Sequence, residues 1–152
     1  MTDIRLRPAT DADAADIARL LAELEHPADQ AAIPARLAAV TREGGAVLVA
    51  VDAADRALGV ISLARHMALH EPGPIGYITA LVTASTARRR GVGQLLVDAA
   101  KEWARRAGCV RLTVTSAERR ADAHAFYPSC GMPYTGRRFA VVFASDPTRR
   151  SA

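Results

Sequence analysis

The sequence has few of the features that mark a disulfide-rich, metal-bound or membrane-spanning protein. Aromatic residues make up 5% of it, and only two cysteines, Cys109 and Cys130, occur in 152 residues. They form no Cys-x-x-Cys pair and the four histidines lack metal-ligand spacing, so we expect reduced thiols and no metal. No apolar run approaches a membrane span, and the start Met1-Thr2-Asp3 does not resemble a signal peptide. We therefore expect a cytoplasmic protein without a membrane partner.

What the chain does have is ordinary globular composition, with 50% hydrophobic and 24% charged residues. The length fits one domain, which we expect to span residues 1–144, followed by a flexible tail at 145–152. Charge is divided unevenly. Residues 1–75 hold seven Lys or Arg against eleven Asp or Glu, whereas residues 76–152 hold thirteen against five. The second part therefore carries a positive field that would attract an anionic ligand.

Hydrophobic periodicity and turn residues predict one mixed sheet with helices on both of its faces. Alternation and short apolar runs predict strands at 4–8, 47–51, 58–63, 75–83, 110–115 and 138–143. Apolar residues at helical spacing predict helices at 11–24, 30–42, 94–108 and 121–127, the last of them stopped by Pro128 and Gly131. The predicted order is β-α-α-β-β-β-α-β-α-β, without an internal repeat or a linker.

The most informative segment is Arg88-Arg89-Arg90-Gly91-Val92-Gly93, between the predicted strand 75–83 and the predicted helix 94–108. A glycine turn that opens a helix presents unpaired backbone N–H groups and the positive end of the helix dipole, which suits phosphate. Leu96 stands where a dinucleotide-binding fingerprint needs a third glycine, and the Gly-Lys-Ser/Thr of a Walker A loop is absent. The turn therefore predicts an anion site of another kind. A solvated charge cluster or a nucleic-acid patch is the alternative interpretation.

The same segment resembles motif A of the GNAT superfamily of acyl-CoA-dependent N-acetyltransferases. The pattern of that motif is Gln/Arg-x-x-Gly-x-Gly/Ala after a strand that ends in a Leu-Val pair. Here it is matched by Arg88, Gly91 and Gly93, and by Leu81-Val82. The order of elements matches as well, so the resemblance covers nearly the whole chain. It implies an α/β (α+β) fold of the GNAT type, with a mixed, mostly antiparallel sheet.

A second segment resembles the end of motif B, with Phe126-Tyr127 and Gly131-Met132 at the expected spacing. The resemblance implies that Tyr127 is the general acid that protonates the departing thiolate of coenzyme A. A phenol suits this role because its pKa of about 10 is close to that of the thiol. Many relatives carry Asn after the strand 110–115, where this chain has Ser116, whose hydroxyl can also bond the cofactor.

The resemblance implies acetyl-CoA as co-substrate and no metal. Backbone N–H groups of residues 89–94 would bind the pyrophosphate, and the backbone of residues 81–83 would bind the pantetheine arm and the acetyl group. The strand 75–83 should separate from its neighbour 110–115 to admit the thioester, with a β-bulge as the usual device. The predicted cofactor-binding residues are Leu81, Val82, Thr83, Arg88, Arg89, Arg90, Gly91, Val92, Gly93, Gln94 and Ser116.

The predicted activity is direct attack of a primary amine, from a small molecule, on the thioester of acetyl-CoA. Two alternatives stay open, a non-catalytic acyl-CoA-binding sensor and a basic nucleic-acid-binding module, although we expect no nucleic acid as partner. The acidic residues Glu23, Glu25 and Asp29 hint at a cationic amine. The acyl-chain preference and a homodimer are left undecided.

The base that deprotonates the amine is not identified by a motif. The candidates are Glu71, His70, Glu25, His26 or an ordered water. A covalent intermediate on Cys130, close to Tyr127 in the sequence, is a minor alternative to direct attack.

Overall fold

The structure of the protein, a computed structural model, describes residues 3–115 and 121–143. It divides the chain into two compact units, Met1–Ser116 and Ala117–Ala152. In the described residues, the first unit contains a five-stranded sheet and the helices α1 to α3, and the second contains the helix α4. The expectation of one domain over residues 1–144 stays a prediction.

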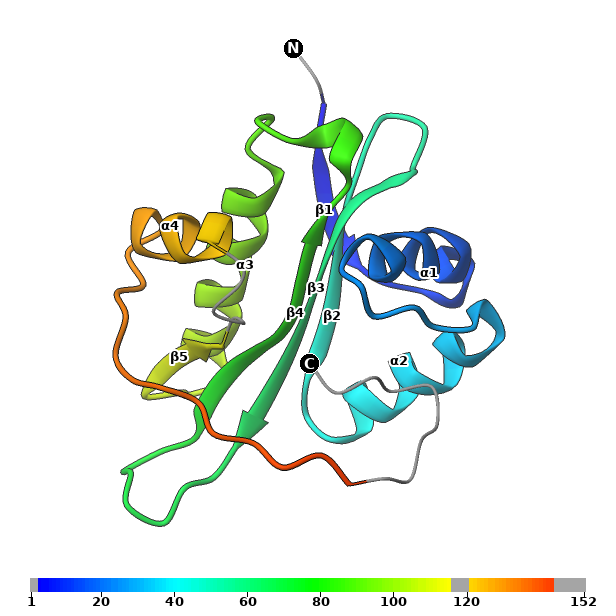
Figure 1. The fold of residues 1–152 in the computed structure, drawn as a ribbon. Helices are drawn as coiled ribbons and strands as arrows, with labels where there is room; N and C mark the ends of the chain where they lie inside the picture. Colours follow the sequence, from blue (N-terminus) through cyan, green and yellow to red (C-terminus); the bar gives the residue numbers. More distant parts are fainter. Residues whose placement is uncertain (1–2, 116–120, 144–152) are drawn as a thin grey trace. The chain divides into compact units, whose positions relative to one another are not determined.

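The strands of the sheet follow one another in the order β1-β2-β3-β4-β5 (Figure 1). Neighbours among the first four strands are antiparallel, and β5 runs parallel to β4. A parallel neighbour needs a crossover connection, which α3 provides. The predicted mixed, mostly antiparallel sheet is therefore confirmed. The strands are β1 (Arg5–Pro8), β2 (Ala46–Val51), β3 (Ala57–His66), β4 (Ile75–Thr83) and β5 (Arg111–Val114).

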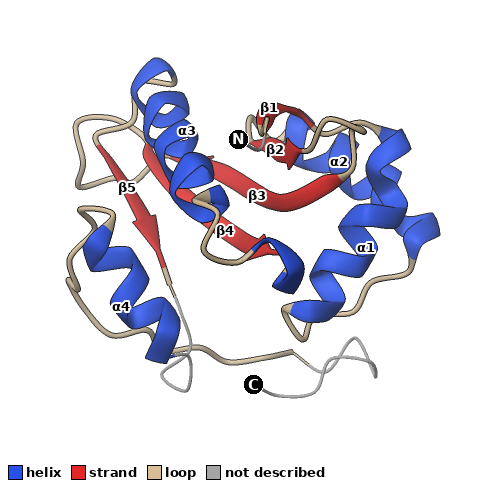
Figure 2. Ribbon diagram, turned by 90° about the horizontal axis from the view of Figure 1, so that it is seen from above, coloured by secondary structure: helices blue, strands red, loops and turns tan. Residues whose placement is uncertain are grey.

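The helices cover both faces of the sheet, as predicted (Figure 2). α1 (Ala14–Glu23) and α2 (Ile33–Arg42) lie on one face and α3 (Val92–Arg106) lies on the other. α3 packs closely on β3 at Gly59, where an added Cβ would meet a methyl group of Val92 at 2.8 Å. On the opposite face Ile17 and Leu20 of α1 are buried. Burial of each such side chain contributes about 1.5–3 kcal/mol, so packing fixes the helices on the sheet.

β5 pairs with only the first part of β4. The parallel register with β5 ends at Ile78, which lies opposite Val114. The next residue, Thr79, is the extra residue of a β-bulge, because Ile78 and Ala80 lie opposite consecutive residues of β3. A bulge bends the strand and increases its twist. The predicted bulge is confirmed. All four residues of β5 pair with β4, and residues 116–120 lie outside the described residues, so the predicted separation of the two strands stays a prediction.

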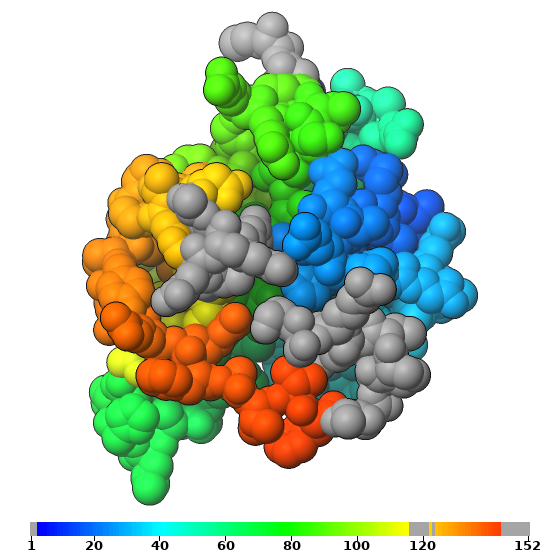
Figure 3. All heavy atoms as spheres, in the orientation of Figure 1, coloured from blue at the N-terminus to red at the C-terminus, as the bar shows by residue number. Residues whose placement is uncertain are grey.

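The connection from β4 to α3 begins with a short 3-10 helix, η3 (Ser85–Ala87), which is fastened to α1. The carboxylate of Glu23, the last residue of α1, accepts a hydrogen bond from the backbone N–H of Ser85 at 2.9 Å and one from its hydroxyl at 3.4 Å. In Figure 3 the blue atoms of α1 lie against the green atoms of this connection. The contact joins a helix on one face of the sheet to the turn that starts the helix on the other face.

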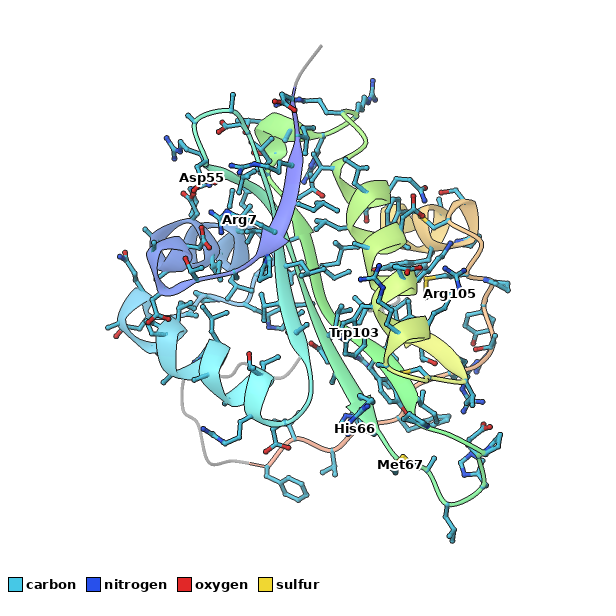
Figure 4. The ribbon with its side chains drawn as sticks, turned by 180° about the vertical axis from the view of Figure 1, so that it is seen from behind. Arg7, Asp55, His66, Met67, Trp103 and Arg105 are labelled. Carbon is cyan, nitrogen blue, oxygen red and sulfur yellow. The ribbon has the colours of Figure 1, made fainter. Side chains whose placement is uncertain are left out.

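A buried carboxylate ties β1 to the turn before α1. Asp13 is only 4% exposed, and each of its oxygens accepts a 2.8 Å hydrogen bond from the Arg7 guanidinium. The Thr10 N–H donates another at 2.7 Å. Arg7 also donates to Asp55, and Figure 4 shows these two side chains beside each other. The hydrogen bonds from Arg7 hold the pKa of Asp13 below its ordinary value in spite of burial.

We expect Asp13→Asn to lower the free energy of unfolding by about 2 kcal/mol near pH 7, because Arg7 loses a charged partner. The pKa of Asp13 is lowered by folding. Its contribution is therefore present above the unfolded pKa of about 4 and is lost as the pH falls toward the lowered value. The difference between wild type and variant should shrink below about pH 4, which urea denaturation at a series of pH values measures.

Asp11→Asn is the matched control for this prediction, because Asp11 lies in the same turn and is exposed. This variant should change the free energy of unfolding by less than about 0.5 kcal/mol at any pH. A loss for Asp13→Asn that stays constant through the acid range would contradict the role given to its carboxylate.

The structure corrects three predicted elements. No strand forms at 138–143, where the described residues have no regular secondary structure. A short apolar run forms a strand only beside a hydrogen-bonded neighbour. α4 (Ala121–Ser129) does not stop before Pro128, since a proline in the last turn removes only one helical hydrogen bond. α3 begins at Val92, two residues before the predicted start, because Gly91 takes the N-cap position.

Candidate active site

The predicted anion-binding turn leads from η3 into α3. Arg88, Arg89 and Arg90 are all exposed, and Gly91 is the N-cap residue of α3 in the left-handed region, at φ +77°. A Cβ added to Gly91 would meet no protein atom within 4 Å, so there is open space beside the helix N-terminus. The first turn of a helix has N–H groups without intrahelical acceptors, and the helix dipole is positive there. The geometry suits a phosphate or pyrophosphate group.

The backbone of this turn is strained and firmly anchored. Arg89 lies in the left-handed region at φ +64°, which costs a residue with a Cβ roughly 1–2 kcal/mol. Strained residues of this kind cluster at ligand-binding turns. Before the turn, buried Ala84 donates its N–H to the Leu58 carbonyl at 2.8 Å, and Ala87 is also buried. The turn is thus held in place from its protein side, while its arginines face solvent.

β4 has an open edge that leads directly to this turn. Leu81, Val82 and Thr83 pair with β3 on one side. On the other side, within the described part of the chain, no strand pairs with them. Backbone N–H and C=O groups need hydrogen-bond partners when they are removed from water. An extended ligand with amide groups can provide these partners in the same way as an additional β-strand. The predicted pantetheine-binding residues therefore lie next to the predicted pyrophosphate-binding turn.

Two adjoining hollows lie on the face of the sheet that α1 and α2 cover. The first, of about 190 Å³, is lined by both helices and by strands β2 to β4, including Ala80. The second, of about 290 Å³, is lined by α2, β3 and the bulge residue Thr79. Val40 and Ser62 line both hollows. The bulge residue Thr79 therefore borders open space on this face of the sheet. It lies close to residues 81–83 of β4, whose edge away from β3 pairs with no described strand.

Residues 14–132 match the family model described as the acetyltransferase (GNAT) family. The chain belongs to this family. This GNAT acetyltransferase is thus an enzyme of a family that uses acetyl-CoA. The open space at Gly91 and the unpaired edge of β4 fit the pyrophosphate and the amide-bearing arm of coenzyme A.

This GNAT acetyltransferase is similar to proteins of known name and structure. The uncharacterized N-acetyltransferase YhdJ of Bacillus subtilis (strain 168) is 43% identical over 51 residues, which are 34% of this chain and 36% of that protein. An acetyltransferase from Trypanosoma brucei has a TM-score of 0.80 at 23% identity, over 93% of this chain and 100% of the other. An aminoglycoside N-acetyltransferase in complex with CoA has a TM-score of 0.82 at 16% identity, over 95% and 97%. The two structural likenesses show a shared fold.

In the second unit of this GNAT acetyltransferase, Tyr127 lies near the C-terminal end of α4. Its ring meets that of Phe126 edge-on, with centroids 5.3 Å apart. Its carbonyl accepts 3.0 Å hydrogen bonds from the N–H groups of Cys130 and Met132. With Gly131 at φ +78°, these bonds cap the helix in the manner of a Schellman motif. The backbone of Tyr127 is thus well fixed within its own unit, and its role as general acid stays a prediction.

The four predicted bases lie in two places. The Glu71 carboxylate pairs with Arg111 at the start of β5, and His70 lies 3.8 Å from the same carboxylate. This cluster lies at the end of β4 away from the arginine–glycine turn. Glu25 and His26 are exposed in the connection between α1 and α2. None of these four described residues lines either hollow, so the choice of base stays open.

Of the remaining predicted cofactor-binding residues, Val92 and Gln94 make contacts within the protein. Val92 is buried and packs α3 onto the sheet, and the Gln94 amide donates to Asp98 at 2.9 Å. Ser116 lies outside the described residues. Sequence patterns did not point to Ser62 or Arg36, which line a hollow. The sequence feature that could have identified Arg36 is its position among the apolar residues on one side of α2.

Two further findings concern the described residues alone. They contain no group of three or more His, Cys, Asp or Glu side chains placed to hold a metal ion. None of their helices is both long and apolar enough to span a membrane.

Proposed function

We propose that this GNAT acetyltransferase transfers an acetyl group from acetyl-CoA to a primary amine of a small molecule. The observation that carries the proposal is that the pairing of β4 with β5 ends at Ile78, so that among the described strands residues 81–83 pair with β3 alone, just before the turn at Gly91. An open strand edge followed by an open helix N-terminus matches, in order, the pantetheine arm and the pyrophosphate. The aminoglycoside N-acetyltransferase with the same fold supports an amine as acceptor.

The proposed roles of the cofactor-binding residues follow from this order. The backbone of residues 81–83 binds the pantetheine arm, and the N–H groups of residues 89–94 bind the pyrophosphate. Arg88, Arg89 and Arg90 surround this site with positive charge, which favours the phosphates of the ligand. Ser116 contributes a hydroxyl.

The proposed chemistry is direct attack. The amine nitrogen forms a bond to the thioester carbonyl carbon, and an N–H group of β4 donates to the carbonyl oxygen as its negative charge develops. The carbon–sulfur bond breaks, and the hydroxyl of Tyr127 gives its proton to the sulfur. The nitrogen loses one proton to Glu71, His70, Glu25, His26 or an ordered water. One proton thus moves from nitrogen to sulfur overall.

We further propose that the protein acts in the cytoplasm, with neither nucleic acid nor a membrane as partner. Cys109 and Cys130 are not joined in a disulfide, which suits a reducing compartment.

Calorimetry with acetyl-CoA should give a dissociation constant of roughly micromolar size, and a panel of small amines should then release free coenzyme A. Release of the thiol is followed with a chromogenic disulfide. Absence of acetyl-CoA binding at low salt, together with tight DNA binding, overturns the proposal. Binding without turnover on any amine would favour the acyl-CoA sensor instead.

A further inference from the structure

The first hollow on the α1/α2 face, of about 190 Å³, is suited to an apolar group. Most of the side chains that line it are aliphatic. They include Ile17 and Leu21 of α1, Leu37 of α2 and Val60 of β3. An apolar cavity of about 150 Å³ accepts a benzene ring. The hollow therefore has room for one aromatic ring or an aliphatic body of that size.

Arg36 is the only charged residue among the described residues that line this hollow. It lies on the apolar side of α2, three residues after Ile33 and four before Val40, where helical spacing places all three together. The Arg36 side chain is exposed, and within the described part of the chain it has no hydrogen bond or ion pair. A long arginine stem can line apolar surface while its guanidinium stays in water. A positive charge is thus left at the opening of an apolar hollow.

The same hollow reaches the strand that the proposed function assigns to the acetyl group. Ala80 lines it and directly precedes Leu81 on β4. Ser62, which lies opposite Ala80 on β3, lines it as well. A molecule in the hollow would therefore lie against one face of β4 beside its unpaired edge.

We propose that the acceptor is a primary amine on an apolar body the size of one aromatic ring, bearing a carboxylate or phosphate that pairs with Arg36. The inference rests on the proposed function, because it assigns the acceptor of that reaction. The apolar lining holds the body and Arg36 holds the anion. A guanidinium binds either anion through charge-assisted hydrogen bonds, which are bidentate at best.

The carboxylates near this face do not favour a polycationic acceptor. Glu23 accepts the hydrogen bonds of Ser85, and Asp29 accepts the Ala31 N–H at 3.1 Å as the cap of a short 3-10 helix. In the second hollow, the lining residue Glu43 is accompanied by the cation of Arg65. The prediction of a cationic amine, drawn from Glu23, Glu25 and Asp29, is therefore weakened by the structural roles of Glu23 and Asp29.

The test compares three amines on the same ring, one negative, one neutral and one positive at the far end. They are 4-(aminomethyl)benzoate, its methyl ester and 4-(aminomethyl)benzylamine, each assayed for kcat/KM with acetyl-CoA. We expect wild type to prefer the carboxylate over the ester by about tenfold, the size of one charged hydrogen bond. Arg36→Gln should abolish this preference, because it lowers kcat/KM for the carboxylate much more than for the ester. Arg36→Glu should prefer the diamine.

Arg42→Gln is the matched control, because Arg42 is an exposed arginine of the same helix that lines neither hollow. It should keep the wild-type order of the three amines. Preference of wild type for the diamine or for spermidine, an equal effect of Arg36→Gln on all three amines, or acetyl-CoA binding with no acetylation of the three overturns this acceptor class. Failure to bind acetyl-CoA in calorimetry overturns the proposed function itself, and the two failures are thereby distinguished.

Discussion

Tyr127→Phe should lower turnover by about 10²–10⁴-fold, the usual contribution of a general acid. Without the phenolic proton, the sulfur must leave as a thiolate. The affinity for acetyl-CoA should stay within about twofold of wild type, since the hydroxyl is needed for proton transfer rather than for binding. Stopped-flow or steady-state kinetics gives the turnover, and calorimetry gives the affinity.

The substitution leaves the backbone of α4 intact, because Tyr127 caps the helix through its carbonyl and its ring stays aromatic against Phe126. Tyr134→Phe is the matched control, since it removes a phenol from the same unit outside the helix. It should have no effect on turnover. If Tyr127→Phe also turned over at the wild-type rate, Tyr127 would not be the acid.

The pH profile separates an acid from a merely structural tyrosine. A general acid must be protonated, so kcat of wild type should fall in the alkaline range where the acid loses its proton. Tyr127→Phe should lack this alkaline decrease, and its smaller kcat should not depend on pH there. An alkaline decrease that survives the substitution would assign the ionisation to another group.

The sheet and its main helices could be predicted because their patterns are local. The stripe of α3 and the apolar runs of β3 and β4 specify element type within a few residues. The prediction of a strand at 138–143 was wrong for the opposite reason. That segment is a short apolar run of the kind found in strands, but strand formation depends on a neighbour elsewhere in the chain, which the local pattern does not supply.

The candidate site likewise has a part that local sequence predicts and a part that depends on contacts between distant residues. The turn at Gly91 is a contiguous motif, so its position at the start of α3 was predictable. The contact between Glu23 and Ser85 joins residues 62 positions apart, so no local sequence pattern predicts it. The bulge could be expected from the need to separate two strands, but its place at Thr79 is set by the pairing with β3. The role proposed for Arg36 could not be predicted from the sequence, because the hollow that it lines is formed by residues of several separate elements.

Gly91→Ala should weaken acetyl-CoA binding by at least about tenfold, which corresponds to 1.4 kcal/mol of binding free energy. The added methyl group meets no protein atom within 4 Å, so it projects into the space where the pyrophosphate is proposed to lie. The left-handed φ of +77° adds strain of about 1–2 kcal/mol, which lowers stability whether or not ligand is present. Calorimetry with acetyl-CoA measures the affinity, and urea denaturation measures the stability.

Gly108→Ala separates these two effects. Gly108 follows the other end of α3, has φ +74°, and likewise has no protein atom within 4 Å of an added Cβ. The two alanine variants should therefore lose similar amounts of stability, about 1–2 kcal/mol each. Only Gly91→Ala should lose affinity, because a helix C-terminus carries the negative end of the dipole and attracts no phosphate. Equal affinities of the two variants for acetyl-CoA would show that the open space at Gly91 is not where the pyrophosphate binds.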